Sequence, residues 1–250
     1  MLILLLCGCL FPACRLGSGN QVKINNEMPG TILWAWERGE DLRFLDTRRF
    51  GVAFLAQTLV LERDEIVFRP RRQPLELAPN TYAIAVTRIE TNKEKNKRPA
   101  LSDKQKNKII SLIKRTMDLP DVRAVQIDFD VMASERNFYK SLARDLRKNL
   151  PENTPLTITA LASWCVGDPW FNEMPVDEAV PMAFRMGADD KAIRDFLAKE
   201  NDWREPLCKG SYGIALDEPL LETKFKPNRR LFIFNSDAKG WKAEDLERLP

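Results

Sequence analysis

The stretch AVQIDFD, residues 124–130, decides how the rest of the chain is interpreted. Side chains alternate between the two faces of a β-strand, so Val125, Ile127 and Phe129 share one face. Gln126, Asp128 and Asp130 share the other face, which has two carboxylates at its C-terminal end. Such a strand packs its apolar face against helices and needs a polar space on its opposite side, which the end of a barrel provides.

Seven further segments have the composition of buried strands and alternate with helical or short connections. They lie at residues 31–37, 51–56, 82–90, 156–164, 179–187, 212–219 and 230–235. A βαβ rhythm implies a parallel sheet, and eight strands imply closure into a (β/α)8 barrel. The sequence therefore predicts a single TIM-barrel-like α/β domain. Its outer helix ring is expected to be incomplete because several connections are too short for helices. An open doubly wound sheet is the alternative.

The connections have recognisable patterns of their own. Residues 59–77 contain two strand-like pieces around a charged turn, which predicts a hairpin, and a short helical turn is expected at residues 41–45. A helix is predicted after Ser102, which forms a capping box with Gln105. Three more helices are expected, one ending before Pro151 and two at residues 189–200 and 243–249.

The 250-residue chain contains no histidine, which excludes several kinds of site. Ser-His-Asp catalysis, Cys-His catalysis and most catalytic zinc sites need that side chain. Acid–base chemistry must therefore use carboxylates, Lys, Tyr or Cys. The formal net charge of +3 is too small to indicate a nucleic-acid partner. The basic runs at residues 69–72 and 93–98 are interpreted as solvated connections.

The first residues are nearly all apolar and predict an exported protein. Residues 1–16 resemble a signal-peptide leader whose apolar run is too short to span a bilayer. LCGC at residues 6–9 resembles a bacterial lipobox, with Cys9 as the lipidated residue. A plain exported protein or a buried N-terminal strand is the alternative. Residues 17–30 then predict a tether, residues 31–250 form the barrel domain, and a lipid anchor at Cys9 would place the protein at a membrane.

Cys165 and Cys208 are the two cysteines outside the leader. An oxidising compartment favours a disulfide between them. The expected strands argue against it, because they place Cys165 beyond the C-terminal end of one strand and Cys208 just before the start of another. Those positions are at opposite ends of a barrel, whereas a disulfide needs Cα atoms within about 7 Å. The pairing therefore stays open at this point.

Polar and aromatic residues gather at the C-terminal ends of the predicted strands, where the sites of such barrels lie. Clustered carboxylates suit acid–base chemistry without histidine, because close packing keeps one acid protonated while another ionises. Flanking tryptophans offer flat apolar platforms for sugar rings. The candidate site residues are Trp36, Glu37, Arg88, Asp128, Asp130, Trp164, Arg185, Asp217 and Glu218.

Each candidate also has a purely structural interpretation. Asp128 and Asp130 are able to pair with Arg88 or Arg185 in an ion network. Glu218 suits a turn or helix cap, and the tryptophans suit core or lid packing. The sequence leaves these alternatives open.

Several short motifs follow one another along the strands: WAWE at residues 34–37, QIDFD at 126–130, ASWC at 162–165, VPM and FRMG within 180–187, and DEP at 217–219. Through these motifs, most of the chain resembles an uncharacterised bacterial family described only as a domain of unknown function. The resemblance implies a glycosidase-like barrel and no settled substrate.

The QIDFD motif also resembles, more distantly, the fourth strand of chitinase-type glycoside hydrolases. That strand carries D-x-D-x-E with the glutamate as the acid. The resemblance places Asp130 in the acid's position, whereas a shifted register places Met132 there and removes the chemistry. In other barrel glycosidases a second carboxylate lies on strand seven, and Glu218 matches it.

The sequence thus predicts an exported glycoside-hydrolase-like barrel that acts on or binds a polysaccharide. Asp130 is the expected general acid, Glu218 the base or nucleophile, and Asp128 tunes Asp130 by like-charge coupling. The rival hypothesis is a non-catalytic glycan-binding or envelope-scaffold lipoprotein, because strand four lacks the acid glutamate. A divalent metal at Asp128 and Asp130 is a weaker third option. No cofactor is expected.

Overall fold

A computed structural model describes residues 27–200, 202–221 and 225–250. The predicted leader at residues 1–16, its Cys9, and the predicted tether as far as residue 26 lie outside the described residues. Within the described residues, no helix is both long and apolar enough to cross a membrane.

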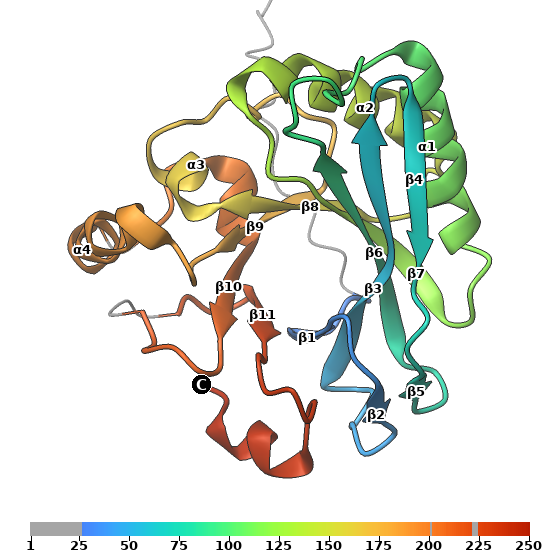
Figure 1. The fold of residues 1–250 in the computed structure, drawn as a ribbon. Coiled ribbons are helices and arrows are strands. Elements are labelled where there is room, and N and C mark those ends of the chain that lie inside the picture. The colour runs from blue at the N-terminus through green and yellow to red at the C-terminus, as the bar shows by residue number, and fades with distance from the viewer. Residues whose placement is uncertain (1–26, 201, 222–224) are drawn as a thin grey trace, which may run out of the picture.

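Eight parallel strands form the centre of the fold (Figure 1). They are β1 (Thr31–Ala35), β3 (Phe50–Glu62), β6 (Tyr82–Thr91), β7 (Val122–Asp128), β8 (Leu156–Leu161), β9 (Glu178–Met182), β10 (Ser211–Ala215) and β11 (Arg230–Phe234). Each strand pairs in parallel with the next, and β1 pairs with both β3 and β11, which closes the sheet into a barrel. The predicted (β/α)8 barrel is confirmed, and the open doubly wound alternative is wrong.

The connections near the N-terminus form extra strands in place of helices. Strand β4 (Glu65–Pro70) pairs antiparallel with the second half of β3, which confirms the predicted hairpin. Strands β2 (Glu40–Leu42) and β5 (Leu75–Leu77) form a separate two-stranded sheet. The short helical turn expected at residues 41–45 is therefore wrong. The backbone there finds a partner in the returning chain, because the Glu40 amide donates to the Pro74 carbonyl.

Four α-helices cover part of the barrel among the described residues: α1 (Asp103–Thr116), α2 (Arg136–Asn149), α3 (Ala162–Val166) and α4 (Asp190–Glu200). Helix α1 begins at the predicted capping box, in which Ser102 and Gln105 each accept the other's backbone amide hydrogen. In Figure 1, α1 and α2 lie on one side of the barrel, and α3 and α4 lie on another. The predicted closing helix is the 3₁₀ segment η4 (Ala243–Arg248). The outer ring is incomplete, as predicted.

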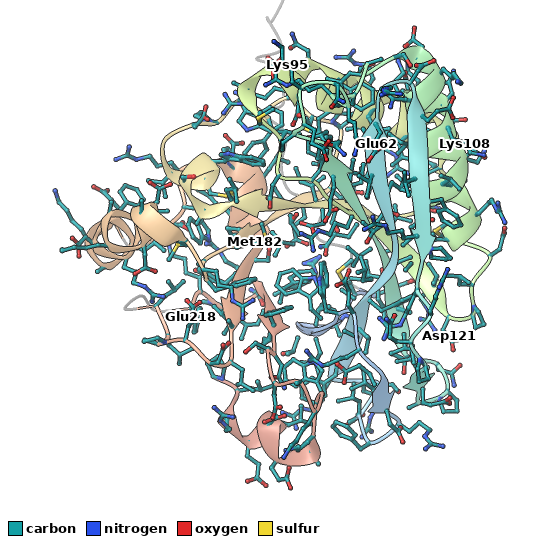
Figure 2. All side chains as sticks on the ribbon, viewed as in Figure 1. Glu62, Lys95, Lys108, Asp121, Met182 and Glu218 are labelled. Carbon is teal, nitrogen blue, oxygen red and sulfur yellow. A yellow bond between two sulfur atoms is a disulfide. The ribbon has the colours of Figure 1, made fainter. Side chains whose placement is uncertain are left out.

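Figure 2 draws the side chains on the ribbon. Two separate groups of buried apolar side chains stabilise this arrangement. The inner group fills the barrel and includes Ile32, Ile84 and Phe232, while the larger outer group lies between the barrel and its covering elements. Val125 and Ile127 of β7 belong to the outer group, whereas Ala124 belongs to the inner group. Gln126 belongs to the interior, where it accepts a hydrogen bond from Trp34 Nε1 (2.9 Å) and donates to Thr157 Oγ1 (3.1 Å). The alternation predicted for this strand is confirmed.

An ion pair lies at the N-terminal ends of the strands. Glu178 is the first residue of β9 and Arg230 is the first residue of β11. Arg230 Nε lies 3.8 Å from Glu178 Oε2, and the two residues are 4% and 1% exposed. Burial raises the pKa of Glu178, and the Arg230 charge opposes that rise. Each charged side chain stabilises the other, because burying a charge without a counterion destabilises the folded protein.

Cys165 and Cys208 form a disulfide, with their Cα atoms 5.9 Å apart. The argument that placed them at opposite ends of the barrel is wrong, because β8 ends at Leu161 and α3 then turns the chain outward. The amides of Arg204 and Glu205 donate to the Cys165 carbonyl, which holds the segment before β10 alongside α3. The cysteines meet in the outer layer and not within the barrel.

Removing this disulfide is expected to cost about 2–4 kcal/mol of unfolding free energy, because it closes a long loop in the unfolded chain. The cysteines are 43 residues apart in sequence. Urea unfolding of the Cys165→Ala/Cys208→Ala variant measures the loss. Reduced wild-type protein is the control, since it loses the cross-link without losing side-chain volume. A reduced protein as stable as the oxidised one would contradict the prediction.

Candidate functional site

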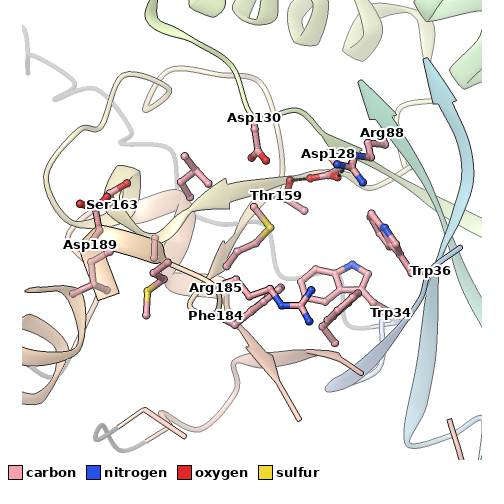
Figure 3. A pocket seen from close by; sticks show the side chains of 16 residues that line it. Trp34, Trp36, Arg88, Asp128, Asp130, Thr159, Ser163, Phe184, Arg185 and Asp189 are labelled. Carbon is pink, nitrogen blue, oxygen red and sulfur yellow. Dashed lines mark hydrogen bonds and ion pairs between the residues drawn. The ribbon is translucent and has the colours of Figure 1, made fainter. Parts of the chain in front are cut away.

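A cavity of about 320 Å³ opens at the C-terminal ends of the barrel strands (Figure 3). Of the nine candidate site residues, five line it: Trp36, Arg88, Asp128, Asp130 and Arg185. They come from strands or strand ends on opposite sides of the barrel, so barrel closure brings them together. This cavity is the candidate functional site.

Asp128 is the last residue of β7, and it is held by the neighbouring strands. Thr159 Oγ1 on β8 donates a hydrogen bond to Oδ1 (2.7 Å), and Arg88 Nε on β6 lies 3.9 Å from Oδ2. The Asp128 side chain is only 12% exposed. Burial, and then the charge of Asp130, raise the pKa of Asp128 to about 6. This carboxyl group therefore holds a proton in the mildly acidic range.

Asp130 follows two residues beyond the end of β7, in the loop before α2. It is more exposed than Asp128, and Figure 3 shows its carboxyl group facing the cavity. Desolvation at the cavity wall raises the pKa of Asp130, while the charges of Arg88 and Lys93 lower it. The sequence predicted Asp130 as the general acid and Asp128 as the residue that tunes it. The structure instead favours Asp128 as the deeper group, whose pKa the Asp130 charge raises.

The raised pKa of Asp128 predicts that this side chain makes stability depend on pH. A carboxyl group whose folded pKa is raised contributes stability that is complete below its unfolded pKa of 3.8 and is lost as pH rises through about 6. The difference between these values corresponds to roughly 3 kcal/mol. We expect Asp128→Asn to be more stable than the wild type at pH 7 and to lose this advantage near pH 4. Chemical unfolding of both proteins at the two pH values measures the change. An advantage of equal size at both pH values would contradict it.

An aromatic wall, defined here as Trp34, Trp36, Phe184 and Phe234, lines the cavity. In Figure 3, Trp34 and Phe184 lie across the cavity from the two carboxyl groups. The rings of Phe184 and Phe234 are stacked, with centroids 5.6 Å apart, and Trp36 packs edge-on against Phe234 at 6.2 Å. The wall is anchored deep in the barrel, because Trp34 donates to Gln126. It presents apolar surface to a bound molecule, while the opposite wall presents charge.

Arg185 has a left-handed backbone conformation, with a φ of 51°, which is unusual for a residue other than glycine. Glu218 Oε1 stabilises this backbone by accepting the Arg185 amide hydrogen (2.9 Å), and Asp217 lies 3.8 Å from the guanidinium. The guanidinium lies over the Phe234 ring, 5.2 Å from its centroid. This arrangement holds the Arg185 side chain at the edge of the cavity.

Glu218 and Asp217 therefore do not line the cavity, contrary to expectation. Glu218 also pairs with Arg194 (3.5 Å), and Asp217 accepts a hydrogen bond from Ser236 (2.6 Å). The predicted strand at 212–219 ends at Ala215, so these two side chains leave from a turn and not from a barrel strand. The structure does not bring Glu218 together with Asp130 in one cavity.

The remaining two candidates, Trp164 and Glu37, lie outside the cavity. Trp164 is buried in the outer core, with its ring 5.1 Å from that of Trp170 and 6.1 Å from that of Phe171. The strand predicted at residues 156–164 changes to helix α3 after Leu161, which turns Trp164 away from the barrel mouth. Glu37 is exposed and lines a neighbouring hollow.

Sequence reasoning missed several residues that line the cavity, notably Thr159, Ser163, Phe184, Asp189 and Phe234. Thr159 and Phe234 lie on predicted strands. The alternation of side chains along those strands could have been used to predict that both residues point into the barrel. Ser163 and Asp189 belong to segments that turn after a strand ends, and no local pattern marks them. Asp189 is the third carboxylate of the cavity lining. Among the described residues, no group of three or more acidic or cysteine side chains is arranged to hold a metal ion.

Comparison of the sequence with protein-family models and with curated proteins finds no match. Of what the predicted resemblance implies, the structure confirms only the barrel architecture. The likeness to an uncharacterised bacterial family and to chitinase-type glycoside hydrolases stays a prediction.

Proposed function

We propose that this protein is a glycoside-hydrolase-like barrel that binds a saccharide in the cavity and cleaves its glycosidic bond. The observation that carries the proposal is a carboxyl pair facing an aromatic wall across one cavity. The C–H face of a sugar ring packs on aromatic side chains, and its hydroxyl groups hydrogen-bond to carboxylates and arginine. A cavity of about 320 Å³ has the volume of a small ligand site.

The carboxyl groups take separate roles in this proposal. Protonated Asp128 donates its proton to the glycosidic oxygen as the bond between that oxygen and the anomeric carbon breaks. Ionised Asp130 stabilises the positive charge that develops on the sugar ring. A water molecule then adds to the anomeric carbon and gives its proton to Asp189, the remaining carboxylate of the lining.

A second candidate function is glycan binding without turnover. The observation that favours it is the engagement of Glu218, the expected base or nucleophile, by Arg194 and by the Arg185 amide. If the cavity lacks a competent base, the aromatic wall and the arginines still bind a sugar. In this case the protein is a glycan-binding lipoprotein of the envelope.

Binding and product release, measured on one panel of bacterial and plant polysaccharides, test both candidates. The cleavage proposal expects new reducing ends that disappear in Asp128→Asn, while glycan binding persists. Binding without any new reducing ends supports the second candidate. The control is Asp118→Asn, an exposed carboxylate just beyond α1. Absence of binding to every glycan would overturn both.

Export and a lipid anchor at Cys9 remain part of the proposal and rest on the sequence of the leader alone. Radiolabelled palmitate incorporation into the protein in a bacterial host tests the anchor. Incorporation is expected for the wild type and not for Cys9→Ala, and Cys14→Ala is the matched control. Equal labelling of Cys9→Ala would contradict Cys9 as the lipidated residue.

A further inference from the structure

A second hollow of about 500 Å³ lies beside the cavity and is lined by part of the β3–β4 hairpin. Its lining includes Glu37, Phe68, Arg69, Arg72 and Glu90. The basic run at residues 69–72 was interpreted from the sequence as a solvated connection. In the structure it forms a wall of this hollow.

The cavity and the second hollow share a boundary. Trp36 lines the cavity and the next residue, Glu37, lines the hollow. Arg88 lines the cavity and forms an ion pair (3.0 Å) with Glu90, which lines the hollow. The two depressions are therefore neighbours at the barrel mouth, separated by Trp36, Glu37 and the Arg88–Glu90 pair.

The arginines that line the hollow differ in whether their guanidinium groups already bind acceptors within the protein. Arg71 is used structurally, because its guanidinium donates to the carbonyls of Trp36 and Arg38. The guanidinium groups of Arg69 and Arg72 have no acceptor and no ion-pair partner among the described residues, and both residues are exposed. Two available guanidiniums thus face the hollow.

The acidic side chains of the hollow do not neutralise the positive charge of Arg69 and Arg72. Glu90 is already paired with Arg88, which leaves Glu37 against Arg69 and Arg72. The hollow also contains an exposed aromatic ring, since Phe68 is 45% exposed. It therefore repeats the composition of the cavity, with an aromatic surface beside polar groups, but with cations in place of the carboxyl pair.

We propose that this hollow binds the carboxylate of an acidic sugar. In this proposal the cavity and the hollow together form one groove, and its ligand is a uronate-containing glycan. This inference rests on the proposed function, since it takes the cavity to bind the adjoining sugar. A planar guanidinium matches a carboxylate in a bidentate arrangement. Phe68 packs against the apolar face of the same sugar ring. Arg185, at the edge of the cavity, adds a cation along the groove.

The test compares tetrasaccharides by isothermal titration calorimetry with the purified full chain. The acidic probes are tetragalacturonate, a mannuronate tetrasaccharide and a hyaluronan tetrasaccharide; the neutral probes are cellotetraose and chitotetraose. We expect at least one acidic probe to bind tenfold or more tightly than any neutral probe at low salt. The preference is expected to shrink as salt is added, because exposed charges are screened. A carrageenan tetrasaccharide, which carries only sulfate esters, serves as a further probe.

The variant Arg69→Gln/Arg72→Gln is expected to lose about tenfold of its affinity for the preferred acidic probe and none for neutral probes. The matched control is Arg115→Gln/Arg144→Gln, which removes the same charge from helices α1 and α2 and is expected to behave as the wild type. Thermal unfolding checks that both variants fold.

The outcomes separate this inference from the proposed function. Equal binding of neutral and acidic probes, or an Arg69→Gln/Arg72→Gln variant that keeps its preference, overturns the inference and leaves the proposed function in place. Tighter binding of the carrageenan probe overturns the choice of carboxylate. Absence of binding by every probe overturns the inference together with glycan binding itself.

Discussion

Asp128→Asn is expected to lower the turnover of a responsive glycan by roughly 100- to 10,000-fold, the usual contribution of a positioned general acid. Asparagine keeps the size of the side chain and still accepts the hydrogen bond from Thr159, which is 2.7 Å in the wild type. It cannot donate a proton to a leaving oxygen. Initial rates of reducing-end release, measured over a range of pH, check the prediction.

The pH dependence gives this prediction a second readout. The wild-type rate is expected to fall as pH rises above about 6, because Asp128 must be protonated and its pKa is about 6. Asp130→Asn removes the neighbouring negative charge that helps to raise this pKa, so the fall is expected at lower pH in that variant. A rate profile for Asp130→Asn that coincides with the wild type would contradict the coupling.

The same substitution separates a catalytic role from a structural one. Asp128→Asn is expected to be more stable than the wild type at neutral pH and yet less active. A residue that only stabilised the fold would lose stability and activity together when replaced. An active Asp128→Asn variant would contradict the assignment of the acid.

Arg230→Met is expected to destabilise the fold by roughly 3–5 kcal/mol, because it leaves the buried Glu178 at the N-terminal end of β9 without its counterion. Both residues are buried, and their charged atoms lie 3.8 Å apart. The loss is expected to diminish at acidic pH, since a protonated Glu178 no longer carries an isolated charge. Urea unfolding at pH 7 and pH 4.5 measures both effects.

The double variant Glu178→Leu/Arg230→Met provides the control for that experiment. Apolar replacement of both members of a buried ion pair is often neutral or stabilising. We expect the double variant to recover most of the stability that Arg230→Met loses. If the double variant is as unstable as the single one, the cost comes from packing and not from the unpaired charge.

The confirmed parts of the fold rest on patterns between near neighbours in the chain. Ser102 and Gln105 form the predicted capping box because both partners lie within one helical turn. The interior position of Gln126 and Asp128 follows from the alternation of a strand. Eight such strands, in order, leave few closed arrangements, and the barrel is the one observed.

The candidate site was predicted only in part. The residues that were wrongly assigned to it lie just beyond the points where strands end. Trp164 and Glu218 were assigned to strand ends that point into the barrel. In the structure the first belongs to helix α3 and the second to a turn that supports Arg185. Strand β8 stops three residues before its predicted end and β10 stops four residues before its own, so the alternation of a strand no longer sets the direction of the side chains that follow.

Composition and local periodicity were enough to predict the fold class, the two faces of strand β7 and the absence of histidine chemistry. The tertiary structure alone decided that Asp128 is the deeper acid, that Cys165 reaches Cys208 and that the basic run at residues 69–72 lines a hollow beside the cavity. These features depend on contacts between residues far apart in the chain. The closure of the barrel and the direction of its loops set those contacts, and no local pattern contains them.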